Sequence, residues 1–183
     1  GQYGTVQNNY VGVTAQNTSL GNSGSGIELS NRDYITVLNN VIANNTGSGI
    51  ALTSNADYAT IDANLIGLMP DTLSAPGNGT TSNGIHINFG KKTTITNNYI
   101  GGQGYWAVQA YFDSDSITIK GNVIGTGLTG TEDFGLNSGG IYSYLRASEM
   151  IIGGNISGEE NIIAYNNGPA IHFQIGTGAG EYI

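Results

Sequence analysis

Aromatic, amide and imidazole side chains recur at every second position in three short stretches of the chain, 85–89, 106–112 and 141–145. In an extended strand, residues two apart point to the same face. Aromatic rings stack on sugar rings, while amide and imidazole groups form hydrogen bonds with hydroxyls. The pattern predicts a polysaccharide-binding surface, with the tryptophan at its edge, made of His86, Trp106, Gln109, Tyr111, Tyr142 and Tyr144. The alternative is structural, because tyrosine is also favoured in ordinary strands.

The acidic side chains do not form a catalytic cluster that can be recognised in the sequence. Hydrolysis of a glycosidic bond usually needs two convergent carboxylates. Asp33, Asp57 and Asp115 instead recur at one repeated turn position, with Lys91 between the last two. This arrangement is typical of turn capping and charge balance. Catalysis is therefore the less favoured interpretation.

The sequence predicts no cofactor and no metal centre. The two histidines, His86 and His172, fall three repeats apart, which is about 14 Å in a stacked structure, so they cannot bind one ion. The acidic pairs Glu132–Asp133 and Glu159–Glu160 are candidates for weak calcium binding only, since isolated acids on solvated loops seldom hold this ion.

Two motifs that alternate six times indicate which elements position these side chains. The second motif, Gly/Ala followed by Ile/Val, begins at 26, 49, 84, 107, 140 and 170. The first motif, Asn-x-Ile/Val, has steps of 31, 24, 34, 24 and 39 residues and begins at Asn9, Asn40, Asn64, Asn98, Asn122 and Asn161. Strict alternation of two motifs at such spacings indicates a solenoid.

The repeats contain short β-branched stretches with period-two alternation, such as 35–37 and 50–52, joined by glycine and asparagine. A strand this short buries a face only when it stacks on its own copies. Connections between parallel strands are almost always right-handed. The sequence therefore predicts an all-β, right-handed parallel β-helix solenoid of about six coils, with residues 1–183 forming a single segment.

The six motif asparagines have a structural explanation in such a coil. At a corner between two strands, a side-chain amide can bond with the amide of the next coil, as in other stacked structures. We therefore expect the asparagines to form an internal ladder rather than a glycan or metal site.

Long and short coils alternate along the chain. The insertions 12–25, 67–83 and 125–139 leave from the same corner, so we expect them to lie side by side on one edge. In the sixth coil the extra residues, 155–160, precede the motif asparagine. Strand alternation predicts inward side chains that extend to Phe89, Phe112, Leu145 and Ile175 at the ends of the last four coils.

The pattern Thr-Ile-x-x-Asn-x-Ile-Gly, a loop rich in Gly, Thr and Asn, and then Gly-Ile-x-Leu resembles the repeats of right-handed parallel β-helix proteins from bacteria and archaea. These repeats are shared by carbohydrate-binding proteins, sugar hydrolases and NosD-like periplasmic proteins. The resemblance extends from Thr5 to about Ile175 and implies an extracellular or cell-surface location. It implies no single function, because this fold carries many.

Composition limits the partners. With a net charge of −8 and five Lys and Arg in total, including Arg146, the chain lacks the basic stripe that nucleic acid requires. It also lacks an apolar run of 18 residues, so we expect no membrane insertion. We recognise no polar cap at either end, and expect the segment to belong to a longer protein or to stack end to end on copies of itself.

The sequence favours a structural or adhesive segment of an exported cell-surface or fibre protein. The alternative is a carbohydrate-binding module, with a polysaccharide lyase or hydrolase less favoured. An enzyme requires convergent carboxylates with perturbed protonation, a binding module requires an exposed aromatic face, and a scaffold requires neither.

Overall fold

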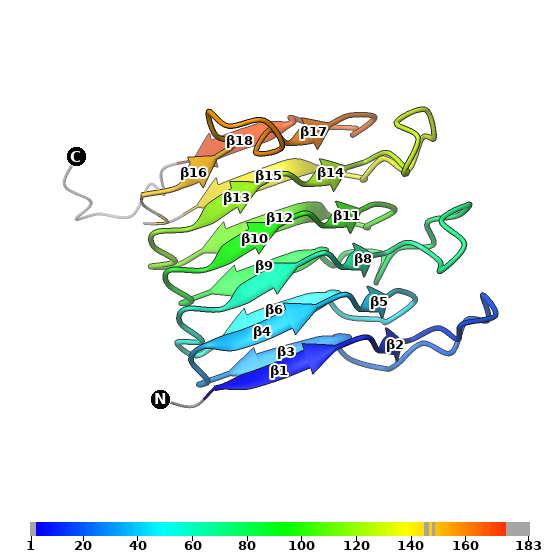
Figure 1. The fold of residues 1–183 in the computed structure, drawn as a ribbon, viewed down its shortest axis with the longest axis horizontal. Coiled ribbons are helices and arrows are strands. Elements are labelled where there is room, and N and C mark those ends of the chain that lie inside the picture. The colour runs from blue at the N-terminus through cyan, green and yellow to red at the C-terminus, as the bar shows by residue number, and fades with distance from the viewer. Residues whose placement is uncertain (1–2, 145–146, 148, 175–183) are drawn as a thin grey trace.

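The computed structural model describes residues 3–144, 147 and 149–174, and these residues form an all-β coil (Figure 1). The strands assemble into three parallel sheets of six strands each, and every coil contributes one strand to each sheet. The fold is the right-handed parallel β-helix of six coils that the sequence predicts.

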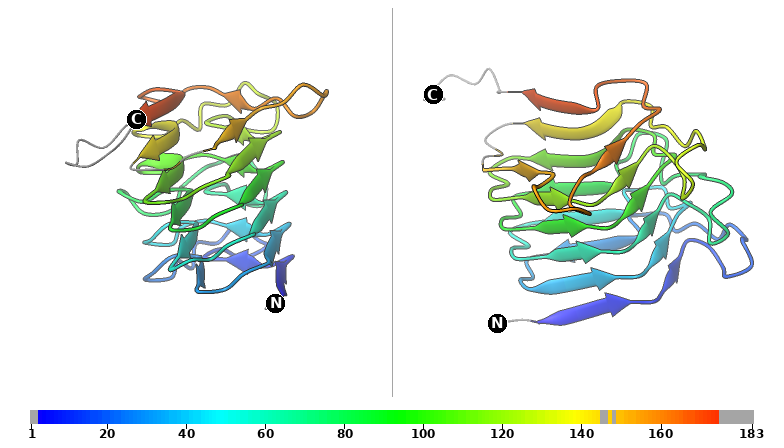
Figure 2. Two further views of the ribbon diagram at one scale, coloured as in Figure 1. Left: turned by 90° about the vertical axis from the view of Figure 1, so that its left-hand side faces the viewer. Right: turned by 45° about the horizontal axis from the view of Figure 1, so that its top comes forward.

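The first sheet contains β1 (Gly4–Gln7), β4 (Ile35–Leu38), β7 (Thr60–Asp62), β10 (Thr94–Thr96), β13 (Thr118–Lys120) and β16 (Ile151–Ile152). The second contains β2 (Tyr10–Val11), β5 (Val41–Ile42), β8 (Leu65–Ile66), β11 (Tyr99–Ile100), β14 (Val123–Ile124) and β17 (Ile162–Ile163). The third contains β3 (Ile27–Ser30), β6 (Ile50–Thr53), β9 (Ile85–Asn88), β12 (Trp106–Tyr111), β15 (Gly139–Tyr144) and β18 (Ile171–Gln174). The first and third sheets form two walls of the coil (Figure 2).

The core is a column of aliphatic side chains between these walls. Val37, Ile61 and Ile95 pair in register on the first sheet and are fully buried, as are Ile50 and Ile85 on the third. Each side chain packs on its copies above and below, so a strand that is too short to bury a face alone gains a continuous dry interior.

Strand alternation predicts two inward positions wrongly. Phe89 and Phe112 follow the last residues of β9 and β12 at positive φ, 62° and 36°, which turns their side chains outward. Both rings are exposed and stack on each other at 5.5 Å between centroids. Leu145 and Ile175, the other two residues for which we expect an inward position at the end of a coil, lie outside the described residues, as does Arg146.

The three long insertions leave the same corner of the coil, after β2, β8 and β14 (Figure 1). The first two touch, because the Asn17 side-chain amide donates to Asp71 Oδ2 at 2.8 Å and the Asp71 backbone N–H donates to Asn17 Oδ1 at 3.1 Å. The insertion 155–160 lies between β16 and β17, before Asn161, as the sequence predicts. None of the described residues forms a helix that could cross a membrane.

Candidate binding groove

The six motif asparagines form one column at the corner between the first and second sheets. Each side-chain amide donates to the side-chain oxygen of the next asparagine, at 2.9 to 3.0 Å for every step from Asn9 to Asn161. Each backbone N–H from Asn9 to Asn122 also donates to that oxygen. The four central asparagines are buried, so these bonds are sheltered from water. This ladder holds the corner, and its four central amides bond with the protein.

A second amide ladder, which sequence reasoning missed, lies at the corner between the second and third sheets. The side-chain amide of Asn22 donates to Asn45 Oδ1 at 2.7 Å, and that of Asn45 donates to Asn78 Oδ1 at 2.9 Å. The backbone N–H of Asn78 then donates to Gln103 Oε1 at 3.0 Å. The variable insertions precede this corner and hide its period. The sequence contains one signal for this ladder, because Asn78 and Gln103 each follow a glycine, and both glycines have positive φ.

An open groove of about 360 Å³ lies on the outer face of the third sheet. Its lining consists of His86, Asn88, Tyr105, Gln109, Tyr111, Phe112, Tyr142 and Tyr144. Strands β9, β12 and β15 supply all of these except Tyr105 and Phe112, which flank β12. His86 pairs with Gln109 and Gln109 with Tyr142, so these side chains form one outward column across the three strands.

Five of the six residues that the sequence predicts for a sugar-binding surface line this groove; Trp106 does not. Sequence reasoning missed Tyr105 and Phe112, because Tyr105 precedes the strand and the alternation assigns Phe112 to the interior. Asn88, two residues after His86 on β9, is not part of the surface that the sequence predicts. The side-chain oxygen of Asn88 is buried without a hydrogen-bond partner.

Aromatic rings form a continuous array along the groove. The Tyr142 ring lies nearly parallel to that of Tyr144, with 5.8 Å between centroids. Tyr144 in turn lies 5.0 Å from Tyr111, and Tyr111 meets Phe112 edge to face at 4.2 Å. Such rings offer flat apolar faces beside hydroxyl groups, which suits a ligand that is apolar on one side and polar at its rim.

Trp106 supports this array from below instead of standing exposed at its edge, as the sequence suggested. Its side chain is 7% exposed, and its ring stacks on that of Tyr142 at 4.8 Å between centroids. Gly139 pairs with Trp106 on the neighbouring strand, and a Cβ at Gly139 would overlap the indole. The missing side chain lets the indole lie flat against β15, where Tyr142 covers it.

A short polar relay fixes the other end of the groove. The Trp106 backbone N–H donates to Asn83 Oδ1 at 3.2 Å, and Asn83 Nδ2 donates to Gln109 Oε1 at 3.0 Å. Gln109 Oε1 also lies 3.0 Å from His86 Nδ1. Asn83 and Gln109 are buried, so the relay is rigid beneath the accessible imidazole.

The described lining of the groove is uncharged at neutral pH. Burial lowers the pKa of His86 from its ordinary value of 6.5, outweighing the hydrogen bond with Gln109 that raises it. Burial also raises the pKa of the Tyr142 phenol, with a smaller contribution from Tyr144. The imidazole is therefore neutral and the phenol protonated under ordinary conditions.

Two of the three acidic corner residues, Asp33 and Asp57, accept from the backbone of the next coil. The Asp57 backbone N–H donates to Asp33 Oδ1 at 3.2 Å, and the Lys91 N–H donates to Asp57 Oδ1 at 2.8 Å. The same corner carries an exposed stack of tyrosine rings, from Tyr3 through Tyr34 to Tyr58. It ends at Lys92, whose ammonium donates to the Tyr58 hydroxyl at 2.9 Å.

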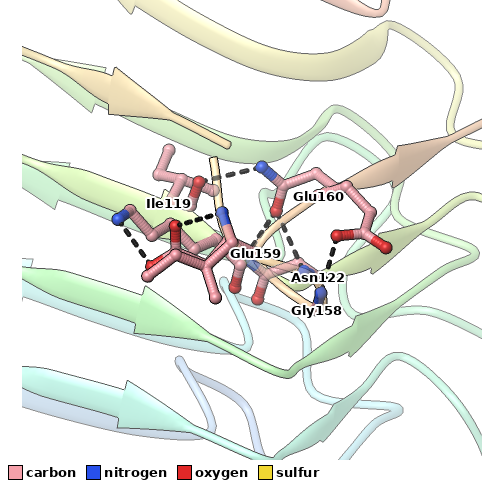
Figure 3. A network of polar contacts seen from close by, with 8 residues as sticks. Ile119, Asn122, Gly158, Glu159 and Glu160 are labelled. Atoms are coloured by element: carbon pink, nitrogen blue, oxygen red, sulfur yellow. Dashed lines mark hydrogen bonds and ion pairs between the residues drawn. The ribbon is translucent and has the colours of Figure 1, made fainter. Parts of the chain in front are cut away.

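The carboxylates suggested for weak calcium binding have local partners, and Figure 3 shows those of Glu159 and Glu160. Glu159 forms a 2.9 Å ion pair with Lys120, and the hydrogen bond with this ammonium lowers the pKa of Glu159. Glu160 accepts from the Gly158 backbone N–H at 2.7 Å. Glu132 accepts from the Thr129 hydroxyl at 2.7 Å, which lowers the pKa of Glu132. Within the described ranges, no three His, Cys, Asp or Glu side chains converge as metal ligands.

A comparison with protein families finds one match of wide extent. The family model described as periplasmic copper-binding protein (NosD) matches residues 2–162. No curated protein and no solved structure matches the chain.

Proposed function

Because the chain belongs to the NosD family, a periplasmic family of parallel β-helix repeats, we propose that this exported β-helix protein binds a polysaccharide in the groove of its third sheet. A periplasmic family agrees with the location outside the cytoplasm that the sequence predicts. The family match covers the coils that form the groove, but it assigns no ligand to the groove.

The observation that carries the proposal is the composition of the groove. Its described lining combines a continuous array of rings with amide and imidazole groups, and holds no charged side chain. Rings that stack on sugar faces and neutral polar groups that bond with hydroxyls are what a polysaccharide requires. The groove is open and crosses three parallel strands, so a chain can lie along it without its ends being enclosed.

The proposal is binding without cleavage. Hydrolysis by the usual route needs a pair of carboxylates on either side of the scissile bond. The described lining contributes phenols, amides and one neutral imidazole, and its polar groups suit recognition of hydroxyls.

The copper named in the family description does not fit the described donor atoms. The chain has no cysteine, and its two histidines lie three strand steps apart on the third sheet, about 14 Å. The thioether sulfur of Met69 accepts from the Asn44 amide, and Met150 packs against the core. Soft thiolate, thioether and imidazole ligands must converge to hold copper, and these do not. We therefore derive no copper chemistry for these residues.

A structural role, which the sequence favours, is the second candidate. Four apolar side chains of the last coil are exposed, with exposed fractions of 54% for Ile151, 51% for Ile162, 43% for Ile171 and 61% for Phe173. Ile171 and Phe173 are in register with buried residues of β15, so a further coil of the same kind would cover them. The two roles are compatible. If the groove binds no polysaccharide, the structural role alone is left.

Affinity electrophoresis tests the binding proposal. Native gels containing hydroxyethyl cellulose, arabinoxylan, galactomannan, soluble starch, alginate or polygalacturonate should retard the wild-type protein in at least one case. Tyr144→Ala should abolish most of the retardation, because Tyr144 links Tyr142 and Tyr111 in the array.

The matched control is Tyr10→Ala, since Tyr10 is an exposed tyrosine on the second sheet. It should migrate like the wild-type protein in every gel. Unhindered migration of the wild-type protein in all six gels would overturn the proposal and leave the structural role.

A further inference from the structure

The polar relay under the groove determines which nitrogen of His86 carries the proton. Its anchor is the Trp106 backbone N–H, which can only donate. It points to the Asn83 side chain at 3.2 Å, so the atom of Asn83 that faces it must be the oxygen. The amide nitrogen of Asn83 must then face the other way, toward Gln109 and His86.

The orientation of Gln109 follows from that of Asn83. Asn83 Nδ2 is a donor, so the Gln109 atom 3.0 Å away from it must be the acceptor Oε1. The opposite orientation of Gln109 would place two amide NH₂ groups against each other in a buried position, which is costly. The orientations of both amides, Asn83 and Gln109, therefore follow from the Trp106 backbone N–H, which can only donate.

The proton on His86 is the next link. Gln109 Oε1 lies 3.0 Å from His86 Nδ1, and two acceptors at this distance would repel each other. A proton on Nδ1 converts the contact into a hydrogen bond. The 3.3 Å separation between Asn83 Nδ2 and His86 Nδ1 is then a contact between two donors of the same oxygen. The relay selects the Nδ1–H tautomer.

His86 Nε2 is left with a lone pair that points to no protein donor. Among the described residues it has no hydrogen-bond partner, and it is not one of the buried polar atoms that lack a partner, so water or a ligand can reach it. The groove thus contains one accessible acceptor nitrogen, held in place by a buried relay.

Among the described residues, the groups that pair with His86 or line the groove beside it carry no charge. Ala51 pairs with it on β6 and Gln109 on β12, and the other titratable groups that line the groove are the phenols of Tyr105, Tyr111, Tyr142 and Tyr144. A carboxylated sugar would lose hydration here and find no cation in the described lining, which is unfavourable. The net charge of −8 opposes it further.

We propose that His86, fixed as the Nδ1–H tautomer, accepts a hydrogen bond at Nε2 from a hydroxyl of an uncharged polysaccharide, and that the groove discriminates against acidic ones. The ligand part of this inference rests on the proposed function, whereas the tautomer can be measured on the protein alone.

Nuclear magnetic resonance of uniformly ¹⁵N-labelled protein at pH 7.5 tests the tautomer. Two-bond ¹H–¹⁵N correlations of the His86 ring should show Nδ1 protonated and Nε2 unprotonated. Gln109→Leu removes the acceptor and should release the ring to a mixture of tautomers. A wild-type ring protonated at Nε2 would overturn the inference whether or not a glycan binds.

Gel retardation tests the ligand class. The protein should be retarded by one or more of the four neutral polysaccharides and not by alginate or polygalacturonate. Equal or stronger retardation by either acidic polymer would overturn this inference while leaving a glycan-binding groove in place. No retardation in any gel would overturn the proposed function, and the ligand assignment with it, even if the tautomer is as inferred.

Two substitutions separate an acceptor role from a packing role. His86→Ala should weaken retention about tenfold, the worth of one hydrogen bond to a buried site. His86→Gln keeps an oxygen acceptor on a side chain of similar reach and should restore binding. The glutamine variant should also bind equally across the acidic range, whereas the wild-type protein should lose affinity as the pH falls through the lowered pKa of His86 and Nε2 becomes protonated. Unchanged affinity of His86→Ala would overturn the acceptor role.

Discussion

The motif asparagine ladder and the aromatic groove arise from the same repeat, and they treat repetition in opposite ways. The ladder has the same residue in all six coils, with nearly equal hydrogen bonds at each step. The column that passes through the groove has a different residue at every step, in the order Glu28, Ala51, His86, Gln109, Tyr142 and His172. An amide inside the coil needs a copy of itself above and below, whereas an outward side chain does not. In this solenoid, repetition identifies the residues that hold the fold, and its interruption identifies candidates for binding.

The two regions also differ in what a substitution should change. The central ladder amides are buried and bonded only to the protein, so removing one should affect stability and leave binding alone. The groove side chains at the surface should affect binding and leave stability nearly unchanged. The predictions below test this separation, beginning with the largest expected effect.

Removal of a central ladder amide should give the largest loss of stability. Asn64→Ala leaves the Asn40 backbone N–H without its acceptor, and it removes one of the acceptors of the Asn40 side-chain amide. It also removes the side-chain donor to Val37 O and leaves Asn98 Oδ1 with the backbone N–H of residue 64 alone. Since each buried group without a partner costs about 1–3 kcal/mol, we expect the free energy of unfolding to fall by about 3 kcal/mol. Urea denaturation followed by circular dichroism measures it.

The control for this experiment is Asn137→Ala, because Asn137 is exposed. It should unfold at the same urea concentration as the wild-type protein. Equal midpoints for Asn64→Ala and the wild-type protein would mean that the ladder does not hold the corner, and the contrast with the groove would be lost.

Trp106→Leu should change both stability and binding, because the indole is buried like the ladder amides and also supports a ring of the groove. The indole is buried, and its ring carries the Tyr142 ring at the surface. Replacing it by a smaller side chain leaves a cavity, so we expect a loss of about 2 kcal/mol in stability together with weaker glycan retention. The two measurements are urea denaturation and gel retardation on the same preparation. Retention at wild-type strength would show that Tyr142 does not need its support.

The sequence predicts the fold well because the fold depends on repeated contacts. Asn40 and Asn64 recur in the same context, so a spacing read along the chain becomes a contact between coils. The second amide ladder was missed because insertions of different lengths separate Asn45 from Asn78, and Gln103 replaces asparagine at the next step. Period alone cannot align residues across insertions of different length.

Within the groove, strand alternation predicts the direction of a side chain correctly only for residues inside a strand. His86 and Gln109 lie inside β9 and β12, and their outward directions follow from period two. Phe112 follows β12, where a positive φ of 36° reverses the expected direction. The burial of Trp106 depends on the absence of a side chain at Gly139, which no rule within one strand supplies. The sequence thus indicates candidates, and neighbouring coils decide which are accessible.

A smaller effect should appear in the pH dependence of stability, through His86 in the groove. Burial lowers the pKa of His86 below 6.5 in the folded protein, so the unfolded chain binds this proton first as the pH falls. The His86 contribution to stability is therefore complete above pH 6.5 and decreases as the pH falls from there toward the folded pKa. Thermal melts between pH 8 and pH 5 should show this decrease in the wild-type protein and a flatter profile in His86→Gln. Parallel profiles for the two proteins would show that His86 titrates normally.

The smallest expected effect is a gain, and it lies at the turn that precedes the ladder. One residue before a ladder asparagine, the chain has positive φ of 57° at Asn8, 54° at Asn39, 55° at Asn97 and 65° at Gly121. Ala63 occupies the same turn in the third coil, at φ 53°. Asparagine tolerates this left-handed conformation better than alanine because its short polar side chain can bond locally. Ala63 is thus the one described member of these five turns that departs from the preferred residues.

Ala63→Asn should therefore raise the free energy of unfolding by about 0.5 kcal/mol, since it relieves part of the left-handed penalty without changing a buried contact. Ala63→Val is the opposing control, because a β-branched residue is strongly disfavoured at positive φ and should lower stability. Urea denaturation resolves both signs when the three proteins are compared in parallel. If Ala63→Asn were less stable than the wild-type protein, the turn would not be governed by backbone conformation. The regularity of the ladder would then come from the amide bonds alone, and the residue before each asparagine would be as free to vary as the side chains that face the groove.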